Sequence, residues 1–80
     1  MTPEQCRAAR AWLDWTQGIL AERAHVALST VKDFEGGKRA PIPATLGAMQ
    51  VALEQVGITF LFVDNVALGI TFAKPGVTPS

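Results

Sequence analysis

The stretch from Thr16 to Gly36 constrains the fold of this 80-residue chain more than any other segment. Its pattern predicts two short helices joined by a tight turn, with Thr16 capping the first of them. Leu20 and Ala24 are spaced at i and i+4, so they stack on the apolar face of the first helix. The turn between the two helices consists of His25, Val26 and Ala27.

The second of these helices divides into an inward and an outward face. Val31, Phe34 and Glu35 lie three and four residues apart, so they share the inward face. The outward side chains are small, polar or charged: Ser29, Thr30, Lys32 and Asp33. A short helix of this kind, supported from behind by another helix, can enter a DNA major groove.

These residues resemble the phage-repressor/Cro-like (XRE) helix-turn-helix family, and the resemblance extends from Arg7 to about Ile58. The matching positions are Thr16-Gln17, Leu20-Ala21, Ala24, Val26, Thr30-Val31, Phe34-Glu35-x-Gly37, Pro41 and Thr45-Leu46.

Two positions depart from the family pattern. His25 replaces the usual glycine, and histidine tolerates a left-handed backbone. Ala27 replaces the usual Ser or Thr cap, whose loss costs about 1 kcal/mol.

The resemblance implies a four-helix DNA-binding domain that acts as a homodimer. The lack of a signal peptide and of a membrane-spanning run predicts a soluble, cytoplasmic chain. Its function would be transcriptional control by binding double-stranded DNA at a palindromic operator, with half-sites about one helical turn apart. The family commonly represses by blocking polymerase, and autoregulation or control of a mobile element is also implied. No enzymatic activity and no cofactor are expected.

The outward face of the second helix supplies the expected DNA contacts. Ser29 and Thr30 can hydrogen-bond bases or phosphates, and Lys32 can donate to guanine or to a phosphate. Leu28 could contact a thymine methyl or pack against its own domain. Asp33 could accept from a cytosine amine or pair with Lys32 or another neighbour.

Three further residues are candidates for phosphate contacts. In the resembling family, the residue at Gln17 commonly contacts a phosphate at the start of its helix, where backbone N–H groups also suit anions. The alternative is a polar residue facing water. Lys38 and Arg39 follow the recognition helix and could reach the DNA backbone, where contacts position the protein without reading sequence. The alternative for this pair is a charged surface loop.

Arg10 and Glu35 are expected to have a structural role. The resembling family often pairs an arginine of the first helix with a glutamate that ends the third. An arginine can hold a carboxylate through two parallel hydrogen bonds. We therefore expect an ion pair with no direct role in base reading.

The composition favours an oligomer and does not exclude a specific DNA binder with a local basic patch. Hydrophobic residues make up 49% of the chain, more than a small monomer buries easily. The formal net charge is zero, which argues against nonspecific nucleic-acid binding. Of the seven lysines and arginines, four fall within one stretch: Arg23, Lys32, Lys38 and Arg39.

The sequence contains no convincing catalytic or metal-binding set. A single cysteine and a single histidine cannot supply the four ligands of a structural zinc site. A Cys–His nucleophile pair would lack an oxyanion signature. Cys6 is better interpreted as a small core residue on the first helix. We also expect neither a signal peptide nor a membrane-spanning segment.

Two more helices flank the central pair. The first begins with Thr2 as cap and Pro3 at the first position, has Gln5 completing a capping box, and runs to about Asp14. Its buried stripe is expected to contain Cys6, Ala9, Leu13 and Trp12. The other helix spans about residues 43–56, and Gly57 ends it. Its apolar positions are Leu46, Met49, Leu53 and Val56.

The remainder is typical of a β-hairpin, which we expect to hold the dimer together. Residues 58–63 are β-branched or aromatic, and residues 68–73 form a second strand after an Asp64-Asn65 turn, with a loop of about four residues. The first strand is apolar on both faces: Ile58, Phe60 and Phe62 on one, Thr59, Leu61 and Val63 on the other. We expect the helices to cover one face and a second copy of the chain to cover the other.

The predicted organisation is thus one mainly α domain over residues 1–74 with its C-terminal hairpin at about 58–73, and a loose tail at 75–80. The alternative function is a protein-interaction module, a helix-turn-helix shape that binds another regulator or a toxin. Neutral net charge and the apolar hairpin favour this alternative.

Overall fold

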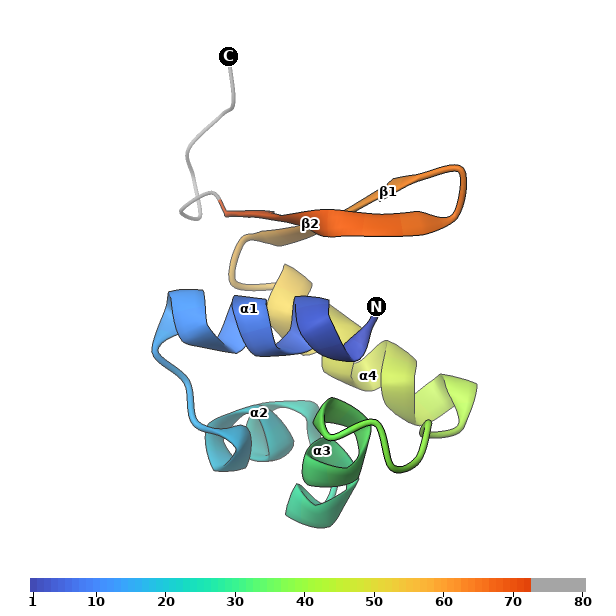
Figure 1. Ribbon diagram of the computed structural model, residues 1–80. Coiled ribbons are helices and arrows are strands. Elements are labelled where there is room, and N and C mark those ends of the chain that lie inside the picture. Colours follow the sequence, from blue (N-terminus) through green and yellow to red (C-terminus); the bar gives the residue numbers. More distant parts are fainter. Residues whose placement is uncertain (73–80) are drawn as a thin grey trace.

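The computed structural model describes residues 1–72 as four helices followed by a two-stranded antiparallel hairpin (Figure 1). The elements are α1 (Pro3–Leu13), α2 (Gln17–Ala24), α3 (Leu28–Glu35), α4 (Pro43–Glu54), β1 (Ile58–Val63) and β2 (Val66–Phe72). The predicted mainly α fold with a C-terminal hairpin is confirmed. The predicted end of the second strand at Ala73 and the tail at 75–80 lie outside the described residues.

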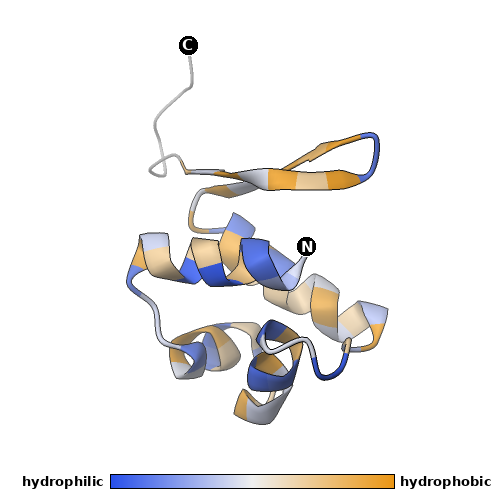
Figure 2. Ribbon diagram, viewed as in Figure 1, coloured by the Kyte–Doolittle hydropathy of each residue, from blue (hydrophilic) through white to orange (hydrophobic). Residues whose placement is uncertain are grey.

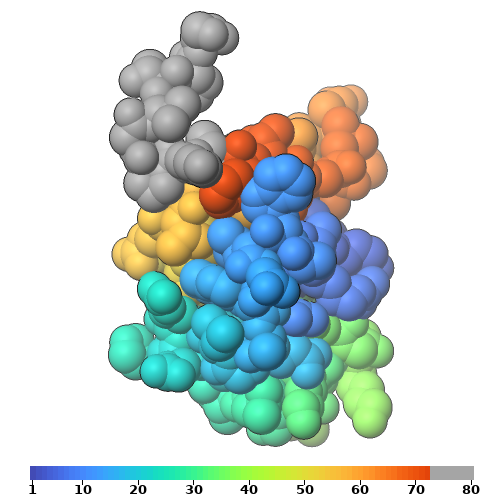
Figure 3. All heavy atoms as spheres, turned by 90° about the vertical axis from the view of Figure 1, so that its left-hand side faces the viewer, coloured from blue at the N-terminus to red at the C-terminus, as the bar shows by residue number. Residues whose placement is uncertain are grey.

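The elements stack in three levels. The hairpin covers one side of α1, and α2 and α3 lie on the other side (Figure 1). A view turned by 90° gives the same order, with the hairpin above α1 and the α2–α3 segment below (Figure 3). α1 therefore separates the predicted recognition helix from the predicted dimerisation strands.

The helix starts follow the predicted capping. Thr2 Oγ1 accepts from the Gln5 backbone N–H at 3.2 Å, and Gln5 Oε1 accepts from the Thr2 N–H at 2.9 Å, which completes the capping box. Thr16 Oγ1 accepts from the Ile19 N–H at 3.1 Å and caps α2. α1 ends one residue before the predicted Asp14, which takes a left-handed backbone (φ 57°). α4 ends two residues before the predicted end at 56.

Both departures from the helix-turn-helix pattern appear in the turn between α2 and α3. His25 adopts the left-handed conformation (φ 57°, ψ 43°), the conformation for which the family uses glycine. Ala27 occupies the N-cap of α3 and provides no side-chain hydrogen bond. The turn therefore keeps its shape, and α3 lacks one capping interaction.

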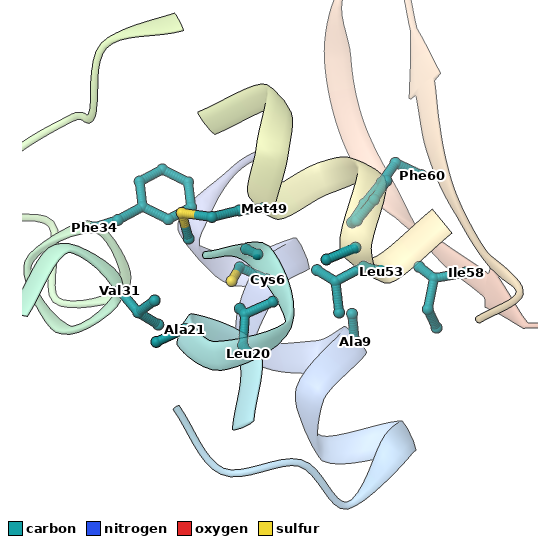
Figure 4. Packing of buried hydrophobic residues seen from close by; sticks show 12 residues of the cluster. Cys6, Ala9, Leu20, Ala21, Val31, Phe34, Met49, Leu53, Ile58 and Phe60 are labelled. Atoms are coloured by element: carbon teal, nitrogen blue, oxygen red, sulfur yellow. The ribbon is translucent and has the colours of Figure 1, made fainter. Parts of the chain in front are cut away.

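The core lies where the four helices and the start of β1 meet, as the packed side chains in Figure 4 show. Leu20, Met49, Leu53 and Ile58 are the largest fully buried side chains. Trp12, expected in the buried stripe of α1, is instead 65% exposed. It lies at the edge of that stripe, and its ring packs at 5.6 Å, centroid to centroid, against Phe72 at the end of β2.

The hairpin turn is tighter than the sequence suggested. Val63 pairs with Val66, so the loop has two residues instead of about four, and β2 begins at Val66 instead of Leu68. Asp64 (φ 51°) and Asn65 (φ 65°) both take left-handed conformations, the combination that a type I′ turn requires. Asp and Asn are the non-glycine residues that tolerate this backbone best.

A β-bulge divides the hairpin into a covered and an uncovered half. The register shifts between Leu61, which faces Gly69, and Phe62, which faces Ala67, and this leaves Leu68 without a partner. Before the bulge, Ile58 and Phe60 are buried as predicted; beyond it, Phe62 of the same face is 46% exposed. The predicted burial of one whole face is therefore wrong, because a bulge bends and twists the strand and the helices cover only the first half.

Candidate nucleic-acid interface

The predicted recognition helix, α3, turns the predicted residues outward. Its buried side chains are Val31, Phe34 and Glu35. On the opposite face, Leu28, Ser29 and Lys32 are exposed, and Thr30 and Asp33 are half-buried. The packing of the inward face thus fixes the helix in the domain and leaves one helical face free. Leu28 is 42% exposed, so it is not buried in its own domain.

A shallow hollow of about 250 Å³ lies between α3 and the start of α4. Its lining residues are Ser29, Thr30, Asp33, Arg39, Ala40, Pro41, Ile42 and Thr45. The backbone N–H groups of Lys38 and Arg39 both donate to the Asp33 carbonyl oxygen, at 2.9 and 3.3 Å, and hold the loop against α3. The structure therefore gathers three hydroxyl groups and the Arg39 side chain beside the outward face of α3.

The side chains of this surface have no polar partners within residues 1–72. Ser29, Thr30, Lys32, Lys38 and Arg39 make neither side-chain hydrogen bonds nor ion pairs to the described part of the chain. Their donors are available to a ligand without breaking an internal contact. The predicted pairing of Asp33 with Lys32 is not formed here.

The side chain of Gln17 points to a different partner from the one predicted. Its Nε2 donates to Glu35 Oε1 at 3.1 Å, so this amide nitrogen braces α3 instead of standing free for a phosphate. Thr16 and Gly18 on either side are exposed. The start of α2 consequently offers its backbone N–H groups to an anion more readily than the Gln17 side chain.

Glu35 is the polar hub that holds α3 to α1. Arg10 forms the expected bidentate pair, with Nε 2.6 Å from Oε2 and Nη2 2.7 Å from Oε1. The Cys6 thiol donates to Oε2 at 3.1 Å, and Arg7 Nη1 donates to the Glu35 backbone carbonyl. Glu35 is only 4% exposed, so these donors replace the water that a carboxylate would otherwise require.

This environment stabilises Glu35 as a carboxylate and Cys6 as a thiol. Burial alone would raise the pKa of Glu35, but hydrogen bonds from Arg10, Cys6 and Gln17 hold that pKa below its ordinary value. Burial raises the pKa of the Cys6 thiol strongly, and the hydrogen bond to Glu35 raises it further. Cys6 is therefore a buried hydrogen-bond donor, and the thiolate needed for nucleophilic chemistry is disfavoured.

The cations of the interface lie on its surface. Lys32, Lys38 and Arg39 are all exposed, and Asp33 is the acidic residue that lines the hollow beside them. Arg23 at the end of α2 lies over the Trp15 ring, 5.1 Å from its centroid. Within residues 1–72, no three His, Cys, Asp or Glu side chains come together as metal ligands.

The predicted dimerisation residues divide into a buried set and an exposed set. Ile58 and Phe60 belong to the core of the chain, and Thr59, Leu61, Phe62 and Val63 are exposed. Sequence reasoning missed two members of the same surface, Val66 and Leu68, which are 59% and 63% exposed. Figure 2 shows the hairpin as a nearly continuous apolar ribbon interrupted by its polar turn. The apolar character of the second strand was the signal that could have found them.

The chain matches no protein-family model and no curated protein. Among the described residues, no helix combines the length and apolar character needed to cross a bilayer.

Proposed function

We propose that this protein is a sequence-specific DNA-binding transcriptional regulator whose α3 enters the major groove. One observation carries the proposal: α3 presents exposed, internally unpaired hydroxyl and ammonium groups on a helix that is fixed from behind. A binding site needs side chains held on a rigid element, and the buried Glu35 network supplies that rigidity.

The contacts divide into those that read bases and those that hold the backbone. Ser29 and Lys32 are one helical turn apart on α3, so both can reach the floor of the groove from the same face. Lys38 and Arg39 flank the helix in the following loop, where they suit phosphates. Thr45 at the start of α4 lines the hollow beside Arg39 and adds a hydroxyl to the same contact surface.

A homodimer formed through the hairpin completes this proposal. Five apolar side chains in the distal half of the hairpin are between 39% and 63% exposed: Leu61, Phe62, Val63, Val66 and Leu68. Such a patch on a small domain is typical of an interaction surface. Within residues 1–72, each strand of the two-stranded sheet also keeps one edge without a strand partner, and a second copy can pair with it.

The position of the hairpin relative to α3 restricts how two copies can pair. The hairpin and α3 lie on opposite sides of α1 (Figure 1). In this arrangement, β1 pairs edge to edge with β1 of a second copy, and the two-fold axis runs from the hairpin towards α3. The helices of both copies then lie on the same side of the joined sheet, so both recognition helices face the same way. One palindromic operator can then contact both. We propose this arrangement for the DNA-binding homodimer.

The rival function, a protein-interaction module, is favoured by the outer face of the same hairpin. Leu61, Val63 and Val66 share that face, and all three are exposed. Stacking two such faces would direct the α3 helices to opposite ends of the dimer, where they could not read one operator. A heterologous partner on this face would cover the apolar side chains without pairing two α3 helices on one operator.

Selection from a random duplex library tests the DNA-binding proposal, with Lys32→Ala as the decisive variant. If Lys32 touches a phosphate, log K should become less steep in log salt by about one unit. If it reads guanine, preference at one base should relax by about 1–3 kcal/mol. Binding constants at two salt concentrations distinguish the two roles.

Gln55→Glu is the matched control, because it makes the same change in net charge at the far end of α4. It should leave the selected sequence and the salt slope unchanged. Failure of the wild type to enrich any sequence would count against the regulator and favour the interaction module. Equal effects of the two variants would remove Lys32 from the interface.

A further inference from the structure

Gln5 is a buried polar side chain that joins α1 to the hairpin. It is only 3% exposed, and its Nε2 donates to the backbone carbonyls of Leu61 at 3.2 Å and Gly69 at 3.0 Å. Its Oε1 accepts from the Thr2 backbone N–H, so both ends of the amide are engaged. Leu61 and Gly69 face each other across the hairpin, immediately before the bulge.

The neighbours of Gln5 hold the other side of the molecule. Cys6 donates to the Glu35 carboxylate, and Arg7 donates to the Glu35 backbone carbonyl at the end of α3. At three consecutive positions of α1, Gln5 therefore contacts the hairpin, and Cys6 and Arg7 contact the recognition helix. α1 is the element through which the orientation of one can be transmitted to the other.

We propose that Gln5 is a positioning residue that fixes the angle of the hairpin relative to α3. Other contacts between the hairpin and the helices are largely apolar, through Ile58 and Phe60, and apolar contacts are not directional. Hydrogen bonds from one amide to two facing carbonyls restrict direction, because such bonds weaken steeply when misaligned. In the proposed dimer, this angle sets the separation of the two recognition helices and thus the half-site spacing.

The angle can be measured without DNA. Spin labels on Glu22→Cys in α2 and Thr71→Cys in β2 occupy two exposed positions, and the buried Cys6 stays unlabelled. Dilution with unlabelled protein isolates the distance within one chain. We expect one narrow distribution in the otherwise unaltered protein and a shifted or broadened one after Gln5→Met, which keeps the side-chain volume and removes the amide.

Thr2→Ala is the matched control for loss of helix stability. It removes the hydroxyl that caps α1 but leaves the Thr2 backbone N–H and the Gln5 contacts to the hairpin. The Thr2 variant should keep the narrow distribution. An unchanged distribution in the Gln5→Met protein, or the same broadening in both variants, would overturn the positioning role.

The consequence for half-site spacing rests on the proposed function and has its own test. Operators whose half-sites are moved apart by two base pairs are rotated by about 70° relative to each other. The wild type should bind them about tenfold or more weakly, and Gln5→Met should lose most of this discrimination, while both bind a single half-site equally. A wild type that binds no DNA would refute the proposed function, and the label distances would still decide the role of Gln5.

A measurement on the unaltered chain covers the case in which Gln5→Met does not fold. The Gln5 Nε2 protons should exchange with solvent far more slowly than those of Gln55, an exposed glutamine at the end of α4. Exchange of Gln5 as fast as that of Gln55 would contradict the two hydrogen bonds and with them the proposal.

Discussion

The two ends of this molecule differ in whether their side chains find partners within the same chain. At the α3 end, the carboxylate of Glu35 is buried, yet Arg10, Gln17 and Cys6 all donate to it from the same chain. At the hairpin end, the side chains from Leu61 to Leu68 are largely apolar, and most of them are exposed to solvent. The buried carboxylate at the α3 end is paired within one copy of the chain, whereas the apolar side chains at the hairpin end are left uncovered in one copy.

The difference supports the proposal that the hairpin surface binds a partner, whereas the Glu35 network serves the fold of the chain itself. A buried charge without partners costs several kcal/mol, so a polar network of this kind must be closed within the fold. Exposed apolar area is tolerated in a folded chain and is relieved when a partner covers it. Changes at the Glu35 end should therefore alter folding, and changes at the hairpin tip should alter association.

The largest effect should follow from breaking the Glu35 hub. Glu35→Gln and Arg10→Met each leave the opposite partner of a buried pair unmatched, and each should lower the free energy of unfolding by about 3–5 kcal/mol. This is a large part of the stability of a small domain. Denaturant titration measures it. Wild-type-like unfolding in both variants would show that the pair contributes nothing to stability.

Acid provides an independent reading of the same pair. Because the pKa of folded Glu35 lies below its unfolded value of about 4.3, its contribution is complete above that pH and is lost as the pH falls through the folded pKa. The wild type should therefore lose more stability between about pH 6 and about pH 3 than Glu35→Gln does. Arg7→Met is the comparison variant for the loss of an arginine. Arg7 is exposed, and within residues 1–72 its side chain contacts the Glu35 backbone carbonyl and the surface residue Glu4. Its loss should therefore cost less stability than the loss of Arg10.

The second effect tests the hairpin end. Leu61→Asp places a carboxylate on the exposed apolar face, and it should weaken the proposed dimer by about 2–3 kcal/mol, or roughly 100-fold in Kd. Helical content and the unfolding transition of the monomer should change little. Sedimentation at micromolar concentration measures the association, and operator binding should weaken with it.

Val51→Asp is the matched control for this change. Val51 is an exposed apolar residue of α4, outside the hairpin, so it introduces the same charge into a similarly exposed position. It should leave association unaltered. A wild type that sediments as a monomer and still binds one half-site tightly would contradict both the dimer and the palindromic operator.

What the sequence predicted well depends on local signals. Thr2, Thr16 and Pro3 mark helix starts through contacts within one turn, and the spacing of Val31, Phe34 and Glu35 assigns the faces of α3 from periodicity alone. The Arg10–Glu35 pair came from the family resemblance, and the structure contains it.

What the sequence did not reveal depends on contacts between distant segments. Gln17 gave no signal that its amide would turn to Glu35, and the capping role of Gln5 concealed its bonds to strands more than fifty residues away. The register shift leaves Leu68 of β2 unpaired, and Phe62 lies beyond the part of β1 that the helices cover, so the burial of Ile58 and Phe60 does not continue to Phe62. Which residue a side chain contacts depends on how the helices and strands pack together, whereas periodicity describes a single helix or strand.

The smallest effect sharpens the comparison at the start of α3. Ala27 is the N-cap of this helix and has no side chain able to accept from the first N–H groups, so Ala27→Ser should add a capping bond. We expect a gain of about 1 kcal/mol, which raises Tm by about 4–8 °C in a domain of this size. Ala11→Ser makes the same chemical change on an exposed position inside α1, where no free N–H is available, and should be neutral or slightly destabilising. Thermal melts of the two variants measure the difference.

The same Ala27→Ser substitution also probes whether the start of α3 binds DNA. Ala27 is the N-cap of α3, so the introduced hydroxyl would accept from an N–H group of the first turn and make that group less available to a phosphate. Stability should therefore rise while operator affinity stays the same or falls. A parallel rise in stability and affinity would mean that these N–H groups do not contact the DNA backbone.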